Sequence, residues 1–372
     1  MKTVFLTIFL IFFMGCTASG QSLRASLETV LSFGGDNTDD TVYHFRNPTG
    51  IKVDKKGSIY ISDQNSSTIR KFNSSGKYIG SIGQKGRGPG EFQEISAFHV
   101  TGVEEILIFD HRSQRFSVTK NSNGEPETIS LKLWENNTYI NIHSIHETDN
   151  GNYYLNYTDN STFLDRYITF NILSDSSLIK SVKIADNGFF NFEEPFNQAT
   201  LLFSSFNFLF NEQFLYITPR YSAGSILKVD LESNNQSTLL GKQPSLPNFK
   251  YIDDSYINRE RSNMTLYSGK AGRFISKIYN VSLGIFEFND NLIEFVFMDS
   301  NNDLQINDIV FGVNRFTKDG EFIGFYEIPE YSNNPIGSFF LKVLWKDDHN
   351  NFYIVDNSEF SEIKVMKLTF YD

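Results

Sequence analysis

The chain has 372 residues and a formal net charge of −11, and aromatic residues make up 15% of it, including 37 Phe and 18 Tyr. No basic tract interrupts this acidity, and a nucleic acid needs clustered Lys and Arg, so we expect no nucleic-acid partner. Cys16 is the only cysteine, which excludes an intrachain disulfide and a zinc site built on cysteines. The aromatic content favours strands over helices.

The first fifteen residues have the pattern of a secretory signal peptide. Lys2 precedes the apolar run Val4–Met14, which is too short for a typical membrane-spanning helix. Cys16 follows directly after Gly15, and this arrangement resembles a bacterial lipobox, which implies that Cys16 is lipidated. The alternative is an ordinary signal peptide with an incidental cysteine. We expect an exported protein of the bacterial cell envelope that is attached to the membrane through the lipid anchor alone.

The segment that follows the signal peptide predicts a tether. Residues 16–26 comprise the lipidated cysteine and a short polar stretch, and we expect the folded domain to span residues 27–372. No cluster of Asp or Glu follows Cys16, whereas in Bacteroides-type bacteria such a cluster resembles a surface-export signal. Its absence favours the periplasmic face slightly over the cell surface.

The segment 47–92 predicts four short strands with turns between them. The strands are expected at Gly50–Val53, Ser58–Ser62, Thr68–Phe72 and Lys77–Ile82. The turns contain Gly57 and Gly76, since glycine accepts a positive φ. Four antiparallel strands in about 40 residues are typical of one propeller blade.

This first blade resembles an NHL repeat. The residues that carry the resemblance are Pro48, Gly50, Ile51, Val53, Asp54, Gly57, Ile59, Tyr60, Ile61, Asp63, Ile69, Phe72, Gly76 and Gly83. The following segment Gly86–Phe92 is similar to the link between blades in six-bladed propeller lipoproteins of Bacteroides-type bacteria. The resemblance implies a six-bladed propeller whose function is poorly defined.

Later segments repeat the second strand of the first blade. Glu105–Asp110 and Asn152–Tyr157 end 47 and then another 47 residues after Asp63. Further strands are expected at Phe214–Thr218, Ser225–Leu231, Leu283–Phe288, Leu292–Met298, Ile309–Thr317, Gly320–Ile328, Phe339–Leu344, Asn351–Asp356 and Ile363–Thr369.

These strands predict an all-β fold, a single six-bladed β-propeller of four-stranded antiparallel blades. The last blade has only three strands of its own, so the N-terminal strand Thr29–Phe33 is expected to join it and close the ring. A pair of β-sandwiches or a seven-bladed ring is the alternative. Ala185–Leu202 and Gly241–Gly272, the latter with a helical turn around Asp254–Arg261, are interpreted as insertions between blades.

Aligning the blades places four side chains at equivalent positions on the strands nearest the axis: Lys52, His99, His146 and Trp345. One hypothesis is that His99, His143 and His146 bind a zinc or calcium ion at the axis, because neutral imidazole is a good zinc ligand. This would be similar to the peptidyl-hydroxyglycine lyases, although no lyase or lactonase motif matches. The other hypothesis is that the histidines are ordinary strand residues, bonded to neighbours or water.

The remaining motifs point to structure rather than catalysis. Asp63, Asp110 and Asp356 recur at the end of the second strand, where each is expected to accept backbone N–H bonds in the following turn. No motif of nucleophilic catalysis is present, so no catalytic residue and no cofactor are predicted. We expect a non-catalytic, monomeric envelope protein that binds a peptide, a glycan or another protein through one propeller face. The alternative is a metal-dependent lyase or lactonase with its site at the mouth of the central channel.

Overall fold

The structure is a computed structural model. It describes residues 23–35, 40–101, 105–119, 140–147, 153–159, 168–174, 177–183, 206–211, 213–219, 223–233, 235–242, 264–269, 272–277, 280–299, 309–332, 342–356 and 361–371. The signal peptide, Cys16, the insertion 185–202 and the helical turn around 254–261 lie outside these residues. Within them, no helix has the length and apolarity that crossing a membrane requires.

The described elements are strands, apart from two short 3-10 turns, η1 (Thr41–Tyr43) and η4 (Pro329–Tyr331). Blade 1 consists of β2 (Pro48–Val53), β3 (Ile59–Asp63), β4 (Ile69–Phe72) and β5 (Tyr78–Ile82). Blade 2 contains β8 (Ile95–Val100), β9 (Ile106–Asp110) and β10 (Arg115–Thr119). Blade 3 consists of β11 (Ile140–Glu147), β12 (Tyr153–Asp159), β13 (Ile168–Ser174) and β14 (Ser177–Lys183). A short parallel pair, β6 (Gln84–Lys85) and β7 (Glu91–Phe92), links blades 1 and 2.

The other half of the ring has the same antiparallel order. Blade 4 consists of β15 (Phe206–Phe210), β16 (Phe214–Pro219), β17 (Ser225–Asp230) and β18 (Gln236–Leu240). Blade 5 consists of β21 (Asn280–Phe288), β22 (Asn291–Asp299), β23 (Ile309–Thr317) and β24 (Phe322–Glu327). Blade 6 consists of β25 (Lys342–Lys346), β26 (Asn351–Asp356), β27 (Glu362–Tyr371) and β1 (Arg24–Gly34). The expected all-β, six-bladed propeller is confirmed, and in blade 2 the described part contains three of the four strands.

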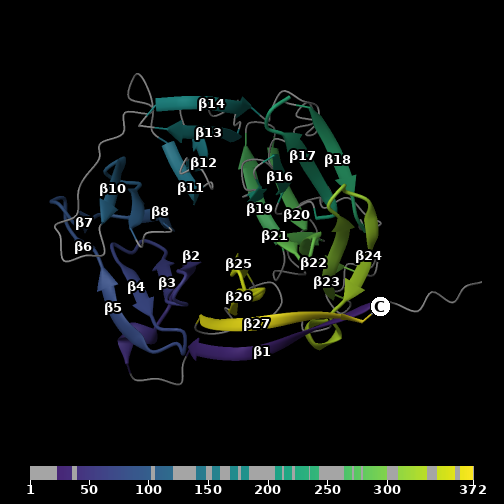
Figure 1. The fold of residues 1–372 in the computed structure, drawn as a ribbon, viewed down its shortest axis with the longest axis horizontal. Helices are drawn as coiled ribbons and strands as arrows, with labels where there is room; N and C mark the ends of the chain where they lie inside the picture. Colours follow the sequence, from purple (N-terminus) through teal and green to yellow (C-terminus); the bar gives the residue numbers. More distant parts are fainter. Residues whose placement is uncertain are drawn as a thin grey trace, which may run out of the picture.

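The sheets stand around a central opening, with the first strand of each blade on the inside (Figure 1). The inner strand β2 contacts β25 on one side and β8 on the other, and β8 in turn contacts β11. On the far side, β21 contacts both β15 and β25. Side chains on these inner strands therefore meet across blade boundaries, which no single repeat specifies.

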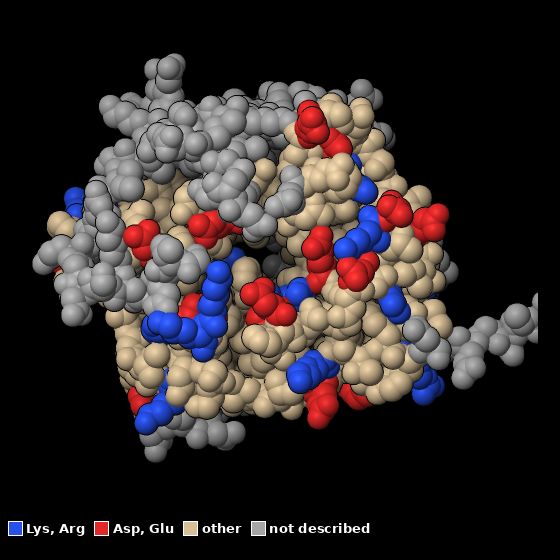
Figure 2. Space-filling view, in the orientation of Figure 1, with Lys and Arg blue, Asp and Glu red and all other residues tan. Residues whose placement is uncertain are grey.

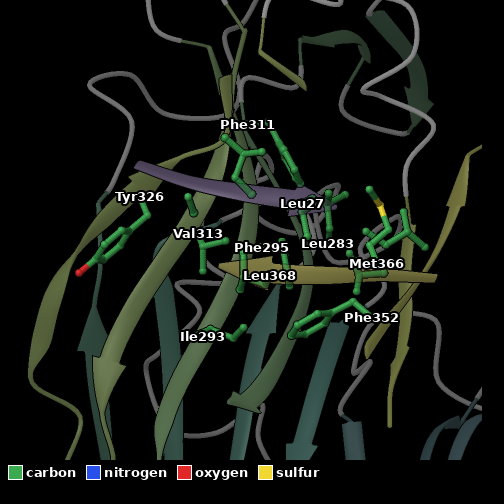
Figure 3. Close-up of a cluster of buried hydrophobic side chains, with 14 of the residues drawn as sticks. Leu27, Leu283, Ile293, Phe295, Phe311, Val313, Tyr326, Phe352, Met366 and Leu368 are labelled. Carbon is green, nitrogen blue, oxygen red and sulfur yellow. The ribbon is translucent and has the colours of Figure 1, made fainter. Parts of the chain in front are cut away.

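The N-terminal strand closes the ring, as expected. β1 pairs antiparallel with β27, from Arg24 opposite Tyr371 to Gly34 opposite Glu362. The strand starts at Arg24, so the expected tether 16–26 is too long by its last three residues. The physical reason is burial: Ala25 is 1% exposed and Leu27 is 8% exposed, because both pack into the core between blades 5 and 6. Figure 3 shows Leu27 within this cluster, close to Leu283, Phe295 and Leu368.

Two of the expected segments differ in detail. The inner strand of blade 6 covers Lys342–Lys346 rather than Phe339–Leu344, and it therefore contains Trp345. Part of the insertion Gly241–Gly272 belongs to a two-stranded hairpin of β19 (Met264–Gly269) and β20 (Gly272–Lys277). In the first blade, Gly57 and Gly76 have φ values of 80° and 75°, which explains why glycine is required at both turns.

The recurring aspartates do more than the sequence predicts. Asp63 accepts bonds from the backbone N–H groups of Arg46 (2.8 Å) and Asn47 (2.6 Å), which precede the inner strand of the same blade. Its bond from the following residue, Gln64, is 3.1 Å and was the expected kind. The carboxylate of Asp63 thus fixes the chain where it enters the blade.

Asp110 repeats this arrangement in blade 2. It accepts from the backbone N–H groups of Gln93 (2.9 Å) and Glu94 (3.1 Å), and from Arg112 in the following turn (3.2 Å). Asp356 differs, because its Oδ2 bonds Lys364 Nζ at 2.7 Å and its Oδ1 has no hydrogen-bond partner among the described residues.

Candidate functional site at the propeller axis

The four residues predicted at the axis lie on four inner strands. Lys52 is on β2, His99 on β8, His146 on β11 and Trp345 on β25. Their partners on the second strands are Tyr60, Leu107, Tyr154 and Tyr353 respectively, so the positions are equivalent in the blades. On the face drawn in Figure 2, the ring is hollowed at its centre, and both basic and acidic side chains lie around the hollow.

Lys52 is a buried amine without a carboxylate partner. The residue is 9% exposed, and its Nζ lies 3.9 Å from the centroid of the Trp345 ring in the neighbouring blade. Burial lowers the pKa of Lys52 to about 7. The indole face attracts the charged form and opposes this shift. No ion pair with an Asp or Glu of the described residues joins Lys52, in contrast to Lys364.

His99 is paired with an acid that the sequence analysis did not select. Its Nε2 lies 3.4 Å from Oε2 of Glu147, the last residue of β11 in the next blade. Burial is the main influence on the pKa of His99 and lowers it; the hydrogen bond to Glu147 raises it, and the charge of Lys52 lowers it again. The ring of Tyr153 packs against His99 with the centroids 6.4 Å apart.

His146 lies beside these groups in a more apolar setting. Its ring is 5.5 Å from that of Phe210, on the inner strand of blade 4, and its Nε2 is 3.3 Å from Ser144 Oγ. Burial, followed by the charges of Lys52 and His99, lowers the pKa of His146 well below its ordinary value. We call Lys52, His99, His146, Glu147 and Trp345 the axial cluster.

The hypothesis of a metal site with three histidines finds no support. His143 is exposed and lies at an irregularity of β11, between Ile142 and Ser144, where the register with β12 shifts by one residue. In the described part of the chain, no three His, Cys, Asp or Glu side chains form a group that could hold a metal ion. The charge of His99 acts on His146, and the described residues offer the pair no third ligand for zinc or calcium.

The chemistry of the axial cluster follows from these contacts. One amine has an aromatic face but no counterion within the described part of the chain, and one imidazole is already paired with a carboxylate. Buried charges are normally paired, because a lone charge loses its hydration without compensation. The arrangement suits the binding of a polar ligand better than it suits structural stabilisation.

A second buried ionisable group lies between blades 4 and 5. Glu294 on β22 is 0% exposed. Its carboxylate accepts bonds from Thr218 Oγ1 (3.0 Å), the Gly224 backbone N–H (3.1 Å) and Asn314 Nδ2 (3.1 Å). Burial raises the pKa of Glu294, and the hydrogen bonds from Asn314, Ser282 and Thr218 offset this in part. The sequence analysis did not select this residue either.

Comparisons with known structures support the fold alone. A solved structure from Bacteroides fragilis, described as an exported protein, is 14% identical to this chain. The two align with a TM-score of 0.53 over 94% of this chain and 96% of the other. A member of the DUF4221 family from Bacteroides vulgatus is 12% identical with a TM-score of 0.58, over 94% and 99%. Virginiamycin B lyase from Staphylococcus aureus is 13% identical over 93% and 100%, and its TM-score of 0.43 carries no argument about activity. No curated protein sequence matches the chain.

A family model gives the more direct result. The model described as a 6-bladed beta-propeller, DUF5128, matches residues 37–233, which is more than half of the chain and spans blades 1 to 4. The chain therefore belongs to the DUF5128 family of six-bladed β-propellers.

Proposed function

We propose that this protein is a non-catalytic, ligand-binding propeller of the bacterial cell envelope, and that its ligand binds at the axial cluster. The observation that carries the proposal is Lys52, an amine buried over Trp345 that has no carboxylate beside it among the residues that the structure describes. A rigid scaffold that keeps such a group unpaired spends stability on it, which is typical of a site prepared for a ligand. The ligand is a peptide, a glycan or a segment of an envelope protein, and the propeller acts as a monomer.

The proposed location rests on the N-terminal sequence and on one relative. The apolar run before Cys16 is typical of an export signal, and the similar Bacteroides fragilis protein is named as exported. We propose that Cys16 carries the lipid anchor and that the propeller faces the periplasm. Metabolic labelling with an alkyne fatty acid tests this: the wild type takes up the label, and Cys16→Ala does not. Equal labelling of both proteins would overturn the anchor.

Native mass spectrometry tests the binding site. The propeller without its signal peptide is equilibrated with oligosaccharides and peptides extracted from envelopes and then weighed intact. We expect a bound mass on the wild type that the double variant Lys52→Met, Trp345→Ala loses. Lys228→Met is the matched control, because Lys228 Nζ also lies 3.9 Å from an aromatic centroid, that of Phe214, but on the third strand of blade 4. A bound mass that persists in the double variant would place the site elsewhere.

A further inference from the structure

The proposed function leaves the chemistry of the ligand open, and the charges of the axial cluster narrow it. We propose that the axial cluster binds the carboxylate of a singly charged ligand, with Lys52 as the group that holds it. This inference rests on the proposed function, since it concerns the same site. It names a ligand class that neither the family nor its structural relatives specify.

The charge balance of the cluster favours one negative charge. Glu147 is engaged by His99 at 3.4 Å, so these two groups already satisfy each other. Lys52 is the one cation of the cluster that has no acidic partner among the described residues. A singly charged anion would neutralise it, whereas a phosphate or a polyanion would bring more negative charge than this one cation offsets. Excess charge that is removed from water is costly, so a single negative charge fits the cluster best.

Burial makes this single contact strong. Lys52 is 9% exposed, so its ammonium group loses most of its hydration whether or not a ligand is bound. A carboxylate at hydrogen-bond distance compensates that loss through a charge-assisted bond, which is stronger than a bond between neutral groups. The indole Nε1 of Trp345 is buried and has no acceptor among the described residues, so it offers a second donor close to Lys52. Two donors match the two oxygens of a carboxylate.

The surroundings favour an apolar or ring-shaped body behind the carboxylate. Tyr153 and Phe210 lie against His99 and His146, and Trp345 lies on the opposite side of Lys52 from these histidines in blade order. Aromatic side chains stack on rings and on the C–H faces of sugars. Two sources share this chemistry: a glycan with a uronic acid, and the C-terminus of a peptide that ends in an aromatic residue.

Affinity should depend on pH in one direction. The titratable groups that interact with the charge of Lys52 are His99 on β8 and His146 on β11. Glu147 and Tyr153 lie behind them, in contact with His99. The carboxylate of a ligand is ionised above pH ~5. The amine of Lys52, with a pKa of about 7, loses its proton at higher pH. Binding should therefore be strongest near pH 6 and weaken as the pH rises past 7, by at most about tenfold per unit.

Calorimetric titration with two matched pairs of probes tests the inference. One pair is N-acetylphenylalanine and its amide, and the other is galacturonate and galactose. At pH 6 we expect at least one acid to bind about tenfold or more tightly than its neutral partner. The acid that binds identifies the source, a peptide terminus or a glycan. In Lys52→Met the acid should bind no better than the neutral probe, while Lys52→Arg and the control Lys228→Met should keep the preference.

Each contrary outcome has a distinct meaning. Equal binding of acid and neutral probe, both lost in the double variant Lys52→Met, Trp345→Ala, would overturn the carboxylate and leave the axial site standing. An acid preference that persists in Lys52→Met would overturn the role of Lys52. No binding of either acid at about 10 mM would overturn the inference, because a Kd of a few millimolar is visible at that concentration. The native mass experiment judges the proposed site independently, and a thermal melt shows that each variant is folded.

Discussion

Lys52 and Glu294 are both ionisable side chains buried inside the ring, and their surroundings differ completely. Glu294 accepts hydrogen bonds from Thr218, Gly224 and Asn314, which come from blades 4 and 5. Lys52 contacts the face of Trp345, and no carboxylate of the described residues pairs with it. The first group has exchanged water for protein donors, while the second has lost water with little in return.

This difference separates scaffold from site. A buried polar group with all its bonds made stabilises the fold and specifies its packing. A buried charge without a partner costs stability, and it persists where function uses it. Burial alone therefore does not identify a functional residue; the count of satisfied bonds does. The following predictions test this contrast, beginning with the largest effect.

Glu294→Ala should destabilise the propeller most, by about 3–5 kcal/mol. The substitution leaves several donors buried without an acceptor and opens a cavity between two blades. Denaturant unfolding measures the effect. Glu294→Gln is the control, since it keeps the shape and can accept and donate in the same place, and it should cost about 1 kcal/mol or less. A loss below about 1 kcal/mol for the alanine variant would show that the hydrogen bonds of Glu294 do not stabilise the fold, and the contrast with Lys52 would fail.

The pH dependence of Glu294 has a definite sign. Its pKa is raised above the ordinary value of 4.5, so the folded state binds a proton more tightly than the unfolded state. Its contribution to stability is then fully present below pH 4.5 and is lost as the pH rises through the raised value. Wild type should therefore gain stability relative to Glu294→Gln on acidification toward pH 4.5. A difference that stays constant between pH 7 and 4.5 would contradict the raised pKa.

Asp110→Ala should cost about 2–3 kcal/mol. The residue is 0% exposed, and the substitution frees the backbone N–H groups of Gln93 and Glu94. Asp356→Ala is the comparison within the same repeat position. Among the described residues Asp356 bonds Lys364 through Oδ2 and its Oδ1 has no partner, so about 1 kcal/mol is expected there. Thermal unfolding of both variants gives the ranking, and a larger loss for Asp356→Ala would contradict it.

The sequence predicts the fold well because each blade repeats its own local signals. The turn glycines and the recurring aspartates lie within single blades, and the 47-residue step relates the first blades to each other. Aligned on these signals, Lys52, His99, His146 and Trp345 are equivalent. Glu147 was missed because its partner, His99, belongs to the neighbouring blade.

Glu294 was missed for the same reason. Two of its donors, Thr218 and Gly224, lie 76 and 70 residues away in the chain. Contacts between blades depend on how the ring closes, and no repeat unit encodes them.

Lys52→Met should raise stability at pH 6, and by about 2–3 kcal/mol more at pH 6 than at pH 9. A depressed lysine pKa means that the unfolded state binds the proton more tightly, so wild type gains stability as the pH rises from about 7 toward 10.5. The methionine variant lacks this gain and removes the cost of a buried charge. Denaturant unfolding at both pH values measures the difference. A loss of more than about 1 kcal/mol at pH 6 would show that Lys52 stabilises the fold, and the contrast with Glu294 would fail.

Arg112→Ala should have the smallest effect, within about 0.5 kcal/mol. The guanidinium Nε lies 2.7 Å from Glu94 Oε2, but the Arg112 side chain is 63% exposed. Water and salt screen an exposed pair, and ordering two long side chains costs entropy. Such a small effect would show that a short distance between two charges does not by itself indicate a large contribution to stability in this propeller. A loss as large as that of Asp110→Ala in thermal unfolding would mean that this exposed ion pair stabilises the fold as much as buried hydrogen bonds do. Solvent exposure would then be the wrong criterion for ranking the polar residues of this propeller.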